Sequence, residues 1–320
     1  MNSATDNTRP VLIVAGPTAS GKSSMAMDIA AEFDGVIINA DSMQVYQNLR
    51  ILTARPDKAD EARVPHRLYG VIPPSQNCSV AHWRDLAVAE VETVLKAGQL
   101  PVVTGGTGMY IRALMQGLAP IPEVPAEIRL AVQAGFDKNG GTALHAELSE
   151  CDPESAARID VGDKQRLIRA VEIYRATETP LSHWISLGNE GGLSNVMFQP
   201  LILMPPREAL YERIDARFHQ MINEGALDEV GKLLELGLDS ELSAMKAVGV
   251  RELAGYLAGD LTLELAVSSA QQASRNYAKR QMTWFRNQIP EAETVFAQYS
   301  ESQRPKIFSF VRQFLLTNPV

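Results

Sequence analysis

The sequence predicts an α/β fold in which a parallel sheet carries helices on both faces. Short, continuous apolar runs alternate along the chain with longer helical stretches. Runs of this kind are typical of strands that are buried on both faces. Because right-handed crossovers join successive parallel strands, the alternation predicts a sheet that is covered on both sides by its connecting helices.

Four apolar runs are the predicted strands, and helices connect them. A helix from Lys22 to about Phe33 follows the first strand, and a helix from Val80 to Leu95 precedes the third. The predicted strands are Val11–Ala15, Val36–Ala40, Leu100–Thr104 and Pro200–Met204.

The long interval between the third and fourth strands predicts an insertion. It is too long for a single crossover, and three prolines between residues 120 and 125 mark its start. We expect residues 120–199 to form a mainly helical subdomain, with a helix from Lys164 to Ala176 and a flexible return linker from Gly188 to Asn195.

Residues 1–119 and 200–320 are then the two parts of the core. After Pro205 and Pro206 the pattern is helical as far as Ile289, which predicts a helical C-terminal region. The expected breaks in this region are Gly225, Gly237 and Gly259.

Composition excludes several classes of protein. The 320 residues carry 30 Lys and Arg against 38 Asp and Glu, a net charge of −8, so a nucleic-acid footprint has to be a local basic patch. Cys78 and Cys151 stand alone, which argues against a zinc site or a disulfide framework. No apolar run is long enough for a signal peptide or a membrane span. We expect a cytoplasmic monomer with no membrane attachment.

The loop after the first strand fits the pattern G-x-x-x-x-G-K-[ST], in the strand-to-helix position that a P-loop requires. Its backbone can wrap phosphate groups, the helix N-terminus adds N–H donors, the lysine neutralises charge, and the serine can ligate Mg²⁺. We therefore predict a P-loop NTPase-like core that binds a phosphate-bearing ligand, for which ATP is the usual example. The loop residues are Gly16, Pro17, Thr18, Ala19, Ser20, Gly21, Lys22 and Ser23.

Two further polar residues follow strands at the same carboxyl edge of the predicted sheet, where ligands of doubly wound folds bind. Asp41 comes directly after the second strand, and Thr107 lies in a second glycine-rich loop, Thr104–Gly108. Asp41 is suited to act as a general base, as an outer-sphere Mg²⁺ ligand, or merely as the N-cap of a following helix. Thr107 is suited to offer its hydroxyl and N–H to an anion, unless the loop is an ordinary turn.

Arg217 interrupts an apolar helix face. A rotation of about 100° per residue places it within the stripe of a helix that is predicted to begin near Pro206. A guanidinium there needs an anionic partner, which is either a structural carboxylate or a ligand phosphate. The stripe consists of Leu210, Ile214, Phe218 and Met221.

Three basic clusters predict a nucleic-acid surface on this acidic chain. Each cluster alone is typical of a solvated helix face, but their joint presence favours phosphate contacts. They are Arg275, Lys279 and Arg286 with the nearby Tyr277, Trp284 and Phe285; Gln165, Arg166 and Arg169 in the insertion; and Lys246 and Arg251 around Gly249.

With these residues the chain resembles the tRNA dimethylallyltransferases, the bacterial tRNA isopentenyltransferase (IPP transferase) family. The matching segments occur in order along nearly the whole chain. They are GPTASGKS at 16–23, DSMQVY at 41–46, TGGTGMYIRAL at 104–114, DKQRLIRAVEIY at 163–174, RIDARFHQM at 213–221, KAVGVRE at 246–252 and RNYAKRQMTWFR at 275–286.

The resemblance implies a reaction. The family transfers the dimethylallyl group of dimethylallyl diphosphate to N6 of the adenosine immediately 3′ of the anticodon, in tRNAs that read codons starting with U. The products are N6-dimethylallyladenosine and diphosphate. A P-loop, usually a sign of nucleoside triphosphate hydrolysis, would then hold an isoprenoid diphosphate.

The resemblance also implies roles for particular residues. Asp41 matches the general base, and Lys22, Ser23 with Mg²⁺, Thr107 and Arg217 match the diphosphate contacts. The insertion would clamp the anticodon stem-loop of tRNA, the implied partner. The matching tRNA-binding residues are Asp41, Ser42, Met43 and Gln44; Gln165, Arg166, Leu167, Ile168 and Arg169; Lys246, Ala247, Val248, Gly249, Val250 and Arg251; and Arg275, Lys279 and Arg280 of the basic C-terminal helix.

Three alternatives share some of these features. A P-loop nucleoside or small-molecule kinase has the same sheet and P-loop but leaves the basic clusters unexplained. An adenylate dimethylallyltransferase that acts on free AMP or ADP needs no tRNA clamp. A non-catalytic tRNA-binding module does not need the set of Asp41, Thr107 and Arg217.

Overall fold

The chain, described here from a computed structural model over residues 8–193 and 195–318, divides into two compact units. The first, which we call the sheet unit, comprises the chain up to Met115 and from Leu193 onward. The second, the inserted unit, is Gln116–Gly192. The insertion expected at 120–199 therefore begins four residues earlier and ends seven residues earlier than predicted, and the residues after it lead into the sheet.

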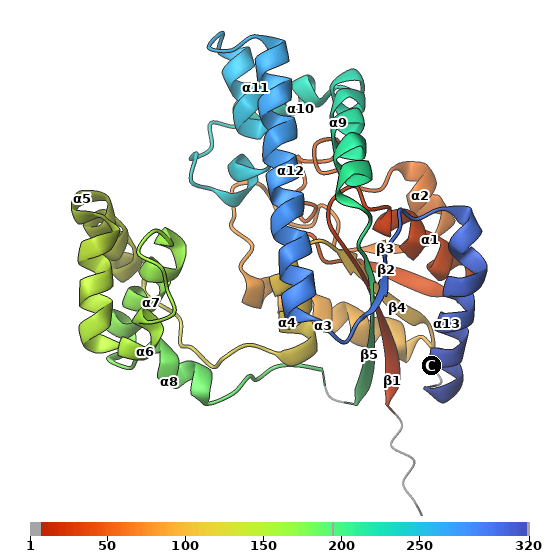
Figure 1. Ribbon diagram of the computed structural model, residues 1–320, viewed down its shortest axis with the longest axis horizontal. Coiled ribbons are helices and arrows are strands. Elements are labelled where there is room, and N and C mark those ends of the chain that lie inside the picture. Colours follow the sequence, from red (N-terminus) through yellow and green to blue (C-terminus); the bar gives the residue numbers. More distant parts are fainter. Residues whose placement is uncertain (1–7, 194, 319–320) are drawn as a thin grey trace, which may run out of the picture. The chain divides into compact units, whose positions relative to one another are not determined.

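The sheet unit is built on a six-stranded sheet, counted over the described residues, with strand order β3-β2-β4-β1-β5-β6 (Figure 1). Every pairing is parallel, which confirms the predicted α/β class. The strands are β1 (Arg9–Ala15), β2 (Gly35–Asn39), β3 (His66–Arg67), β4 (Leu100–Gly105), β5 (Val196–Leu203) and β6 (Glu293–Val295).

Alternate residues of the strands feed two separate hydrophobic layers. Leu12 and Val14 of β1 pack with residues of α1 (Lys22–Glu32) and α13 (Arg304–Thr317). Val11 and Ile13, which point to the opposite face, pack with α3 (Val80–Lys96), α4 (Gly108–Gln116) and α12 (Leu263–Gln288). Helices thus cover both faces of the sheet, as a buried parallel sheet requires.

The C-terminal part of the sheet unit is helical, as predicted. After β5 come α9 (Arg207–Asn223), α10 (Ala226–Leu234), a 3₁₀ turn (Ser243–Lys246) and α11 (Val250–Leu257), and then α12. The predicted breaks at Gly225, Gly237 and Gly259 lie between these helices, and all three glycines have a positive φ. This left-handed backbone conformation is easily reached only by glycine.

The inserted unit is a helical body with its own small core. It contains α5 (Ala126–Cys151), α6 (Pro153–Ala156), α7 (Lys164–Thr177) and α8 (Leu181–Ser186), drawn in yellow to green in Figure 1. Gly140 kinks α5 with a φ of 77°. Leu148 and Leu167 are completely buried in the core between α5 and α7. The helix predicted at Lys164–Ala176 is confirmed.

Several elements differ from the sequence expectation. β5 begins at Val196, four residues before the predicted strand, and in the predicted linker Glu190 forms a β-bridge with Leu118. Ser194 of that linker lies outside the described residues. The short helix α2 (Lys58–Arg63), the edge strands β3 and β6, and α13 were not predicted. Two or three residues carry no readable periodicity, so the edge strands are defined only by their neighbours. Within the described ranges no helix is long and apolar enough to cross a membrane.

Candidate functional site

The P-loop begins where β1 ends and closes onto the N-terminus of α1. Gly21, with a φ of 91°, is the residue before the helix, and Gly16 lies against the carbonyl of Leu203 in β5, where a β-carbon would be only 2.6 Å away. Lys22 and Ser23 line a cavity of about 590 Å³, which we call the P-loop cavity. Gly21 is required for its left-handed conformation, and Gly16, with a φ of 153°, is required for both conformation and space.

Lys22 has an altered acidity in this cavity. Its Nζ donates to the carbonyl oxygen of Pro17 at 3.2 Å, and no ion pair to it is formed among the described residues. Burial lowers the pKa of the Lys22 ammonium to about 8, an effect that Asp41 opposes and Arg217 reinforces. A desolvated cation without a counter-ion is well suited to bind an anion.

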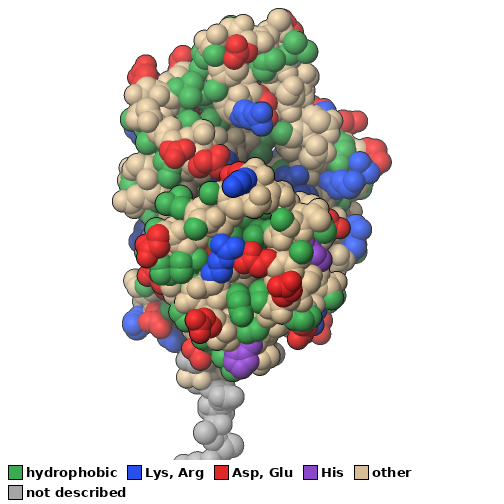
Figure 2. Space-filling view, turned by 90° about the vertical axis from the view of Figure 1, so that its left-hand side faces the viewer, with side chains coloured by type: hydrophobic (Ala, Val, Ile, Leu, Met, Phe, Trp, Pro, Cys, Tyr) green, Lys and Arg blue, Asp and Glu red, His purple; other side chains and the backbone are tan. Residues whose placement is uncertain are grey.

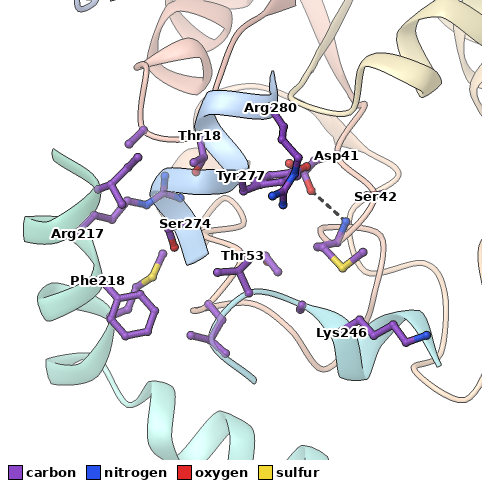
Figure 3. Close-up of a pocket in the computed structure, with 17 residues that line it drawn as sticks. Thr18, Asp41, Ser42, Thr53, Arg217, Phe218, Lys246, Ser274, Tyr277 and Arg280 are labelled. Atoms are coloured by element: carbon purple, nitrogen blue, oxygen red, sulfur yellow. Dashed lines mark hydrogen bonds between the residues drawn. The ribbon is translucent and has the colours of Figure 1, made fainter. Parts of the chain in front are cut away.

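A second cavity, of about 270 Å³, lies beside the first, and we call it the Asp41 cavity. Asp41, Tyr277 and Arg280 lie together on one side of it, whereas Arg217 reaches in from α9 with Phe218 next to it (Figure 3). Leu52, Ile214 and Met221 add apolar surface. The two cavities share Ala19, Arg217 and Met221.

Asp41 is held in a turn rather than at the start of a helix. One carboxylate oxygen, Oδ1, accepts the N–H of Met43 at 3.0 Å, and the Asp41 N–H donates to Oδ1 of Asn39 at 2.9 Å. The hypothesis that Asp41 caps a following helix is therefore wrong, because the residues after Asp41 form turns. The carboxylate still lines the cavity, with its second oxygen unused by any hydrogen bond among the described residues.

Thr107 is more constrained than the sequence suggested. Its N–H donates to the carbonyl oxygen of Ala40 at 3.1 Å, so it is not free to bind an anion. Its hydroxyl accepts the N–H of Ser42 at 2.9 Å and donates to the Ser42 hydroxyl at 3.2 Å. The second glycine-rich loop thus anchors the turn that carries Asp41.

Arg217 lies where the apolar stripe of α9 predicted it. The stripe residues Leu210, Ile214, Phe218 and Met221 are buried. Among the described residues Arg217 forms no hydrogen bond or ion pair, and burial lowers its pKa despite the opposing charge of Asp41. The guanidinium therefore faces both cavities without a bonded partner, as a ligand-binding arginine would.

Sequence reasoning missed Glu229, which shapes the wall of both cavities from α10. Its carboxylate accepts the N–H groups of Arg50, Ile51 and Leu52 at 2.7, 2.7 and 3.0 Å. The loop that these bonds hold contributes Leu52 to the Asp41 cavity and Arg50 to the P-loop cavity. The only signal would have been one of two acids in the first turn of a helix, where such residues are common anyway.

The basic C-terminal helix, α12, was predicted as nucleic-acid surface, but its residues face different surroundings. Arg280 lines the Asp41 cavity and stacks over the ring of Tyr277, with 5.7 Å between the guanidinium carbon and the ring centroid. Lys279 is exposed and lines a surface groove together with Trp284. Arg275 forms an ion pair with Asp215 of α9, so part of its charge is already compensated.

The remaining predicted tRNA-binding residues divide into exposed and buried ones. Ser42, Met43, Lys246, Ala247 and Val248 line the Asp41 cavity. Gln44 instead donates to the carbonyl oxygens of Thr53 and Ala54, and Val250 is buried. Arg251, which follows Gly249 and Val250, is exposed. Of these predicted tRNA-binding residues, only those whose side chains are not buried in the core can contact a partner directly.

In the inserted unit, Gln165, Arg166 and Arg169 are exposed on α7, but Leu167 and Ile168 are buried in its core. These two apolar residues hold the helix and cannot contact a partner directly. The face of the molecule in Figure 2 carries acidic and basic side chains interspersed, without one continuous basic stripe. This distribution fits the negative net charge.

The sheet, the strand-to-helix glycine loop and the adjoining cavities define a P-loop α/β protein in which a lysine and an arginine lie at cavities next to a carboxylate. Residues 44–288 match the model of the IPP transferase family. A tRNA dimethylallyltransferase of Rhodospirillum centenum is 55% identical over 89% of this chain and 91% of its own. One of Paramagnetospirillum magneticum is 48% identical over 98% of this chain and 100% of its own. The chain therefore belongs to the IPP transferase family.

Solved structures agree with this assignment. The tRNA isopentenylpyrophosphate transferase of Bacillus halodurans has a TM-score of 0.70 and 33% identity, over 97% of this chain and 98% of its own. A eukaryotic dimethylallyltransferase acting on tRNA has a TM-score of 0.84 over 98% of this chain and 81% of its own, at 23% identity. At this identity, the likeness to the eukaryotic structure shows a shared fold.

Proposed function

We propose that the protein transfers the dimethylallyl group of dimethylallyl diphosphate to N6 of the adenosine immediately 3′ of the anticodon, in tRNAs that read codons starting with U. One observation carries the proposal: the P-loop cavity and the Asp41 cavity adjoin, and Arg217 lines both. A diphosphate in the first cavity and an adenine in the second would meet beside this arginine.

The P-loop cavity would hold the leaving group. As the allylic C–O bond breaks, negative charge accumulates on the diphosphate, and fixed cations and N–H donors stabilise it. Lys22 and Arg217 are cations without a bonded carboxylate among the described residues, and the P-loop supplies backbone donors. Thr107, whose N–H and hydroxyl both bond within the protein, would act by holding the turn that carries Asp41. The apolar residues Leu52, Ile214 and Met221 suit a five-carbon group.

Asp41 would act as the general base. An exocyclic adenine amine is a weak nucleophile because its lone pair is delocalised into the ring, so removal of its proton assists C–N bond formation. The carboxylate oxygen of Asp41 that holds no hydrogen bond is available for this proton. The base of an anticodon loop reaches such an enclosed site only when it is flipped out of its stack, at a cost of a few kcal/mol.

The tRNA would be held by residues around the mouth of the Asp41 cavity and by the inserted unit. Lys246 and Arg280 line that cavity, and Lys279 lies on the same helix as Arg280. Arg166 and Arg169 are exposed on α7. Contacts at these positions would offset the cost of flipping the base. Because tRNA is cytoplasmic, the same proposal puts the protein there, and we expect it to act as a monomer.

Mg²⁺ is the metal that the proposal implies, and the donors at the P-loop fit it. The Ser23 hydroxyl is exposed at the cavity and forms no hydrogen bond with a described residue. Among those residues there is no cluster of three or more His, Cys, Asp or Glu that would form an all-protein metal site. Mg²⁺ commonly keeps several waters and binds through few protein oxygens plus substrate phosphates. Ser23 would hold it, and the ion would neutralise diphosphate charge.

One assay tests the proposal. The protein is incubated with Mg²⁺, labelled dimethylallyl diphosphate and either unmodified tRNA or AMP, while phosphate release from ATP is followed in parallel. We expect label in tRNA alone, on the adenosine next to the anticodon. Label only in AMP would identify an adenylate dimethylallyltransferase, and ATP turnover without prenylation would identify a kinase. If the protein binds tRNA but transfers no label, it is a non-catalytic tRNA-binding module.

A further inference from the structure

Gln281 on α12 bridges the two glycine-rich loops. Its side-chain oxygen accepts the N–H of Thr18 in the P-loop at 2.8 Å, and its side-chain nitrogen donates to the carbonyl oxygen of Gly106 at 2.9 Å. The side chain is 5% exposed. Both ends of one buried carboxamide are therefore used, and each end holds a different loop.

Gly106 leaves room for the Gln281 side chain because it has no β-carbon. A β-carbon at Gly106 would lie 2.2 Å from the side-chain nitrogen of Gln281, far closer than real atoms approach. Its φ is not in the left-handed region. Glycine thus serves here for space rather than for conformation, and a side chain at this position would displace the Gln281 carboxamide.

A second glutamine holds the other half of the P-loop. The side-chain nitrogen of Gln298, beyond β6, donates to the carbonyl oxygens of Ala19 and Ser20 at 3.3 and 2.6 Å. Between them, the two glutamines fix backbone groups of three successive loop residues. The N–H groups of Thr18 and Ser20 both bond within the protein, the second to the carbonyl oxygen of Pro17 at 3.3 Å, so a ligand has to use the other amides of the loop.

The bridge connects the two halves of the proposed reaction. Gly106 directly precedes Thr107, whose hydroxyl accepts the N–H of Ser42 beside Asp41. The path from the P-loop to the turn that carries Asp41 therefore runs through one carboxamide and one short loop. Displacements of about 1 Å between reacting groups can cost about a hundredfold in rate.

Building on the proposed function, we infer that Gln281 is a positioning residue of the transfer reaction. It holds the loop that binds the diphosphate in register with the loop that supports the general base. It touches neither the reacting carbon nor the base, and it acts through Thr18 and Gly106. Loss of the carboxamide leaves the part-buried N–H of Thr18 and the buried C=O of Gly106 without this partner, and both loops then relax away from the geometry that the reaction needs.

The test replaces Gln281 by methionine, which keeps the length of the side chain and removes both hydrogen bonds. Gln271→Met is the matched control, because Gln271 is also buried on α12 and bonds one carbonyl, that of Asp215, away from the loops. Gly106→Ala displaces the carboxamide without changing Gln281 and serves if Gln281→Met does not fold. The measurements are kcat, KM for each substrate, tRNA affinity, and calorimetric affinity for inorganic diphosphate with Mg²⁺.

We expect Gln281→Met and Gly106→Ala to lower kcat/KM for dimethylallyl diphosphate by about ten- to a hundredfold and to weaken diphosphate binding, with tRNA affinity unchanged. Gln271→Met should match the wild type in all of these. The inference is overturned if Gln281→Met keeps the wild-type kcat/KM and diphosphate affinity, or if Gln271→Met changes them equally. A wild-type protein without transfer activity would instead reject the proposed function, and the diphosphate measurement would still test Gln281.

Discussion

Paired basic side chains of the inserted unit contrast with two cations at the cavities of the sheet unit. In the inserted unit, Lys164 pairs with Asp137 and Arg175 pairs with Glu147, at 2.8 and 2.7 Å. In the sheet unit, Lys22 and Arg217 reach the cavities, and neither forms an ion pair with any described residue. Burial lowers the pKa of both of these cations.

This difference distinguishes basic side chains that are paired within the fold from basic side chains that are available to bind a ligand. A paired surface arginine contributes little to stability and is free to be replaced. A desolvated cation without a partner costs free energy in the unliganded protein, and that cost is recovered only when an anion binds. The contrast predicts that equivalent substitutions in the two units have different consequences.

The largest effect is expected at Asp41, the carboxylate next to the unpaired cations. Asp41→Asn keeps an oxygen for the N–H of Met43 but removes the base, so turnover should fall by about two to four orders of magnitude. The affinity for tRNA should largely survive. Single-turnover transfer and filter binding measure the two quantities, and unchanged turnover would remove Asp41 as the base.

The next largest effect is expected when Arg217 of the sheet unit is replaced by methionine. We expect kcat/KM for dimethylallyl diphosphate to fall by about a hundred- to a thousandfold, because a preorganised cation at the leaving group is lost. The Tm of the free protein should not fall, since the lost charge has no partner. Differential scanning fluorimetry should also find less stabilisation by the diphosphate. A large loss of Tm in the free protein would make Arg217 a structural residue.

A smaller effect, which depends on pH, is expected at Lys22. Only the protonated amine attracts the diphosphate, so kcat/KM for dimethylallyl diphosphate should decline as the pH rises through the Lys22 pKa of about 8. The limiting decline is about tenfold per pH unit. Lys22→Arg, which stays charged, should flatten this limb of the profile even if its maximum is lower. A profile that is identical in the two proteins would assign the decline to another group.

The smallest effect is expected for the same substitution in the inserted unit. Arg175→Met removes an ion pair whose two side chains are 40% and 36% exposed. The free energy of unfolding should fall by about 1 kcal/mol or less, and kcat/KM for dimethylallyl diphosphate should not change. Urea unfolding and steady-state kinetics measure both. A loss of activity comparable to that of Arg217→Met would abolish the distinction between the two units.

The sequence predicted the parts of the protein that depend on local pattern. The P-loop, the four central strands, the helix at Lys164 and the buried setting of Arg217 all follow from short-range periodicity and spacing. The edge strands β3 and β6 did not follow, because two or three residues hold no period. The roles of Thr107 and Gln44 were also only partly accessible, since each bonds a neighbouring loop instead of facing open space.

By itself, then, the sequence determined the fold class, the family and the residue types that surround the cavities. The tertiary structure decided which of those residues have partners. Gln281 meets Thr18 across 263 residues and Gly106 across 175, and no local pattern encodes contacts at such separations. The same holds for the side-by-side placement of Lys22, Asp41 and Arg217, which come from three different elements. Their pKa values and bonding partners depend on burial and neighbours, and only the folded chain supplies these.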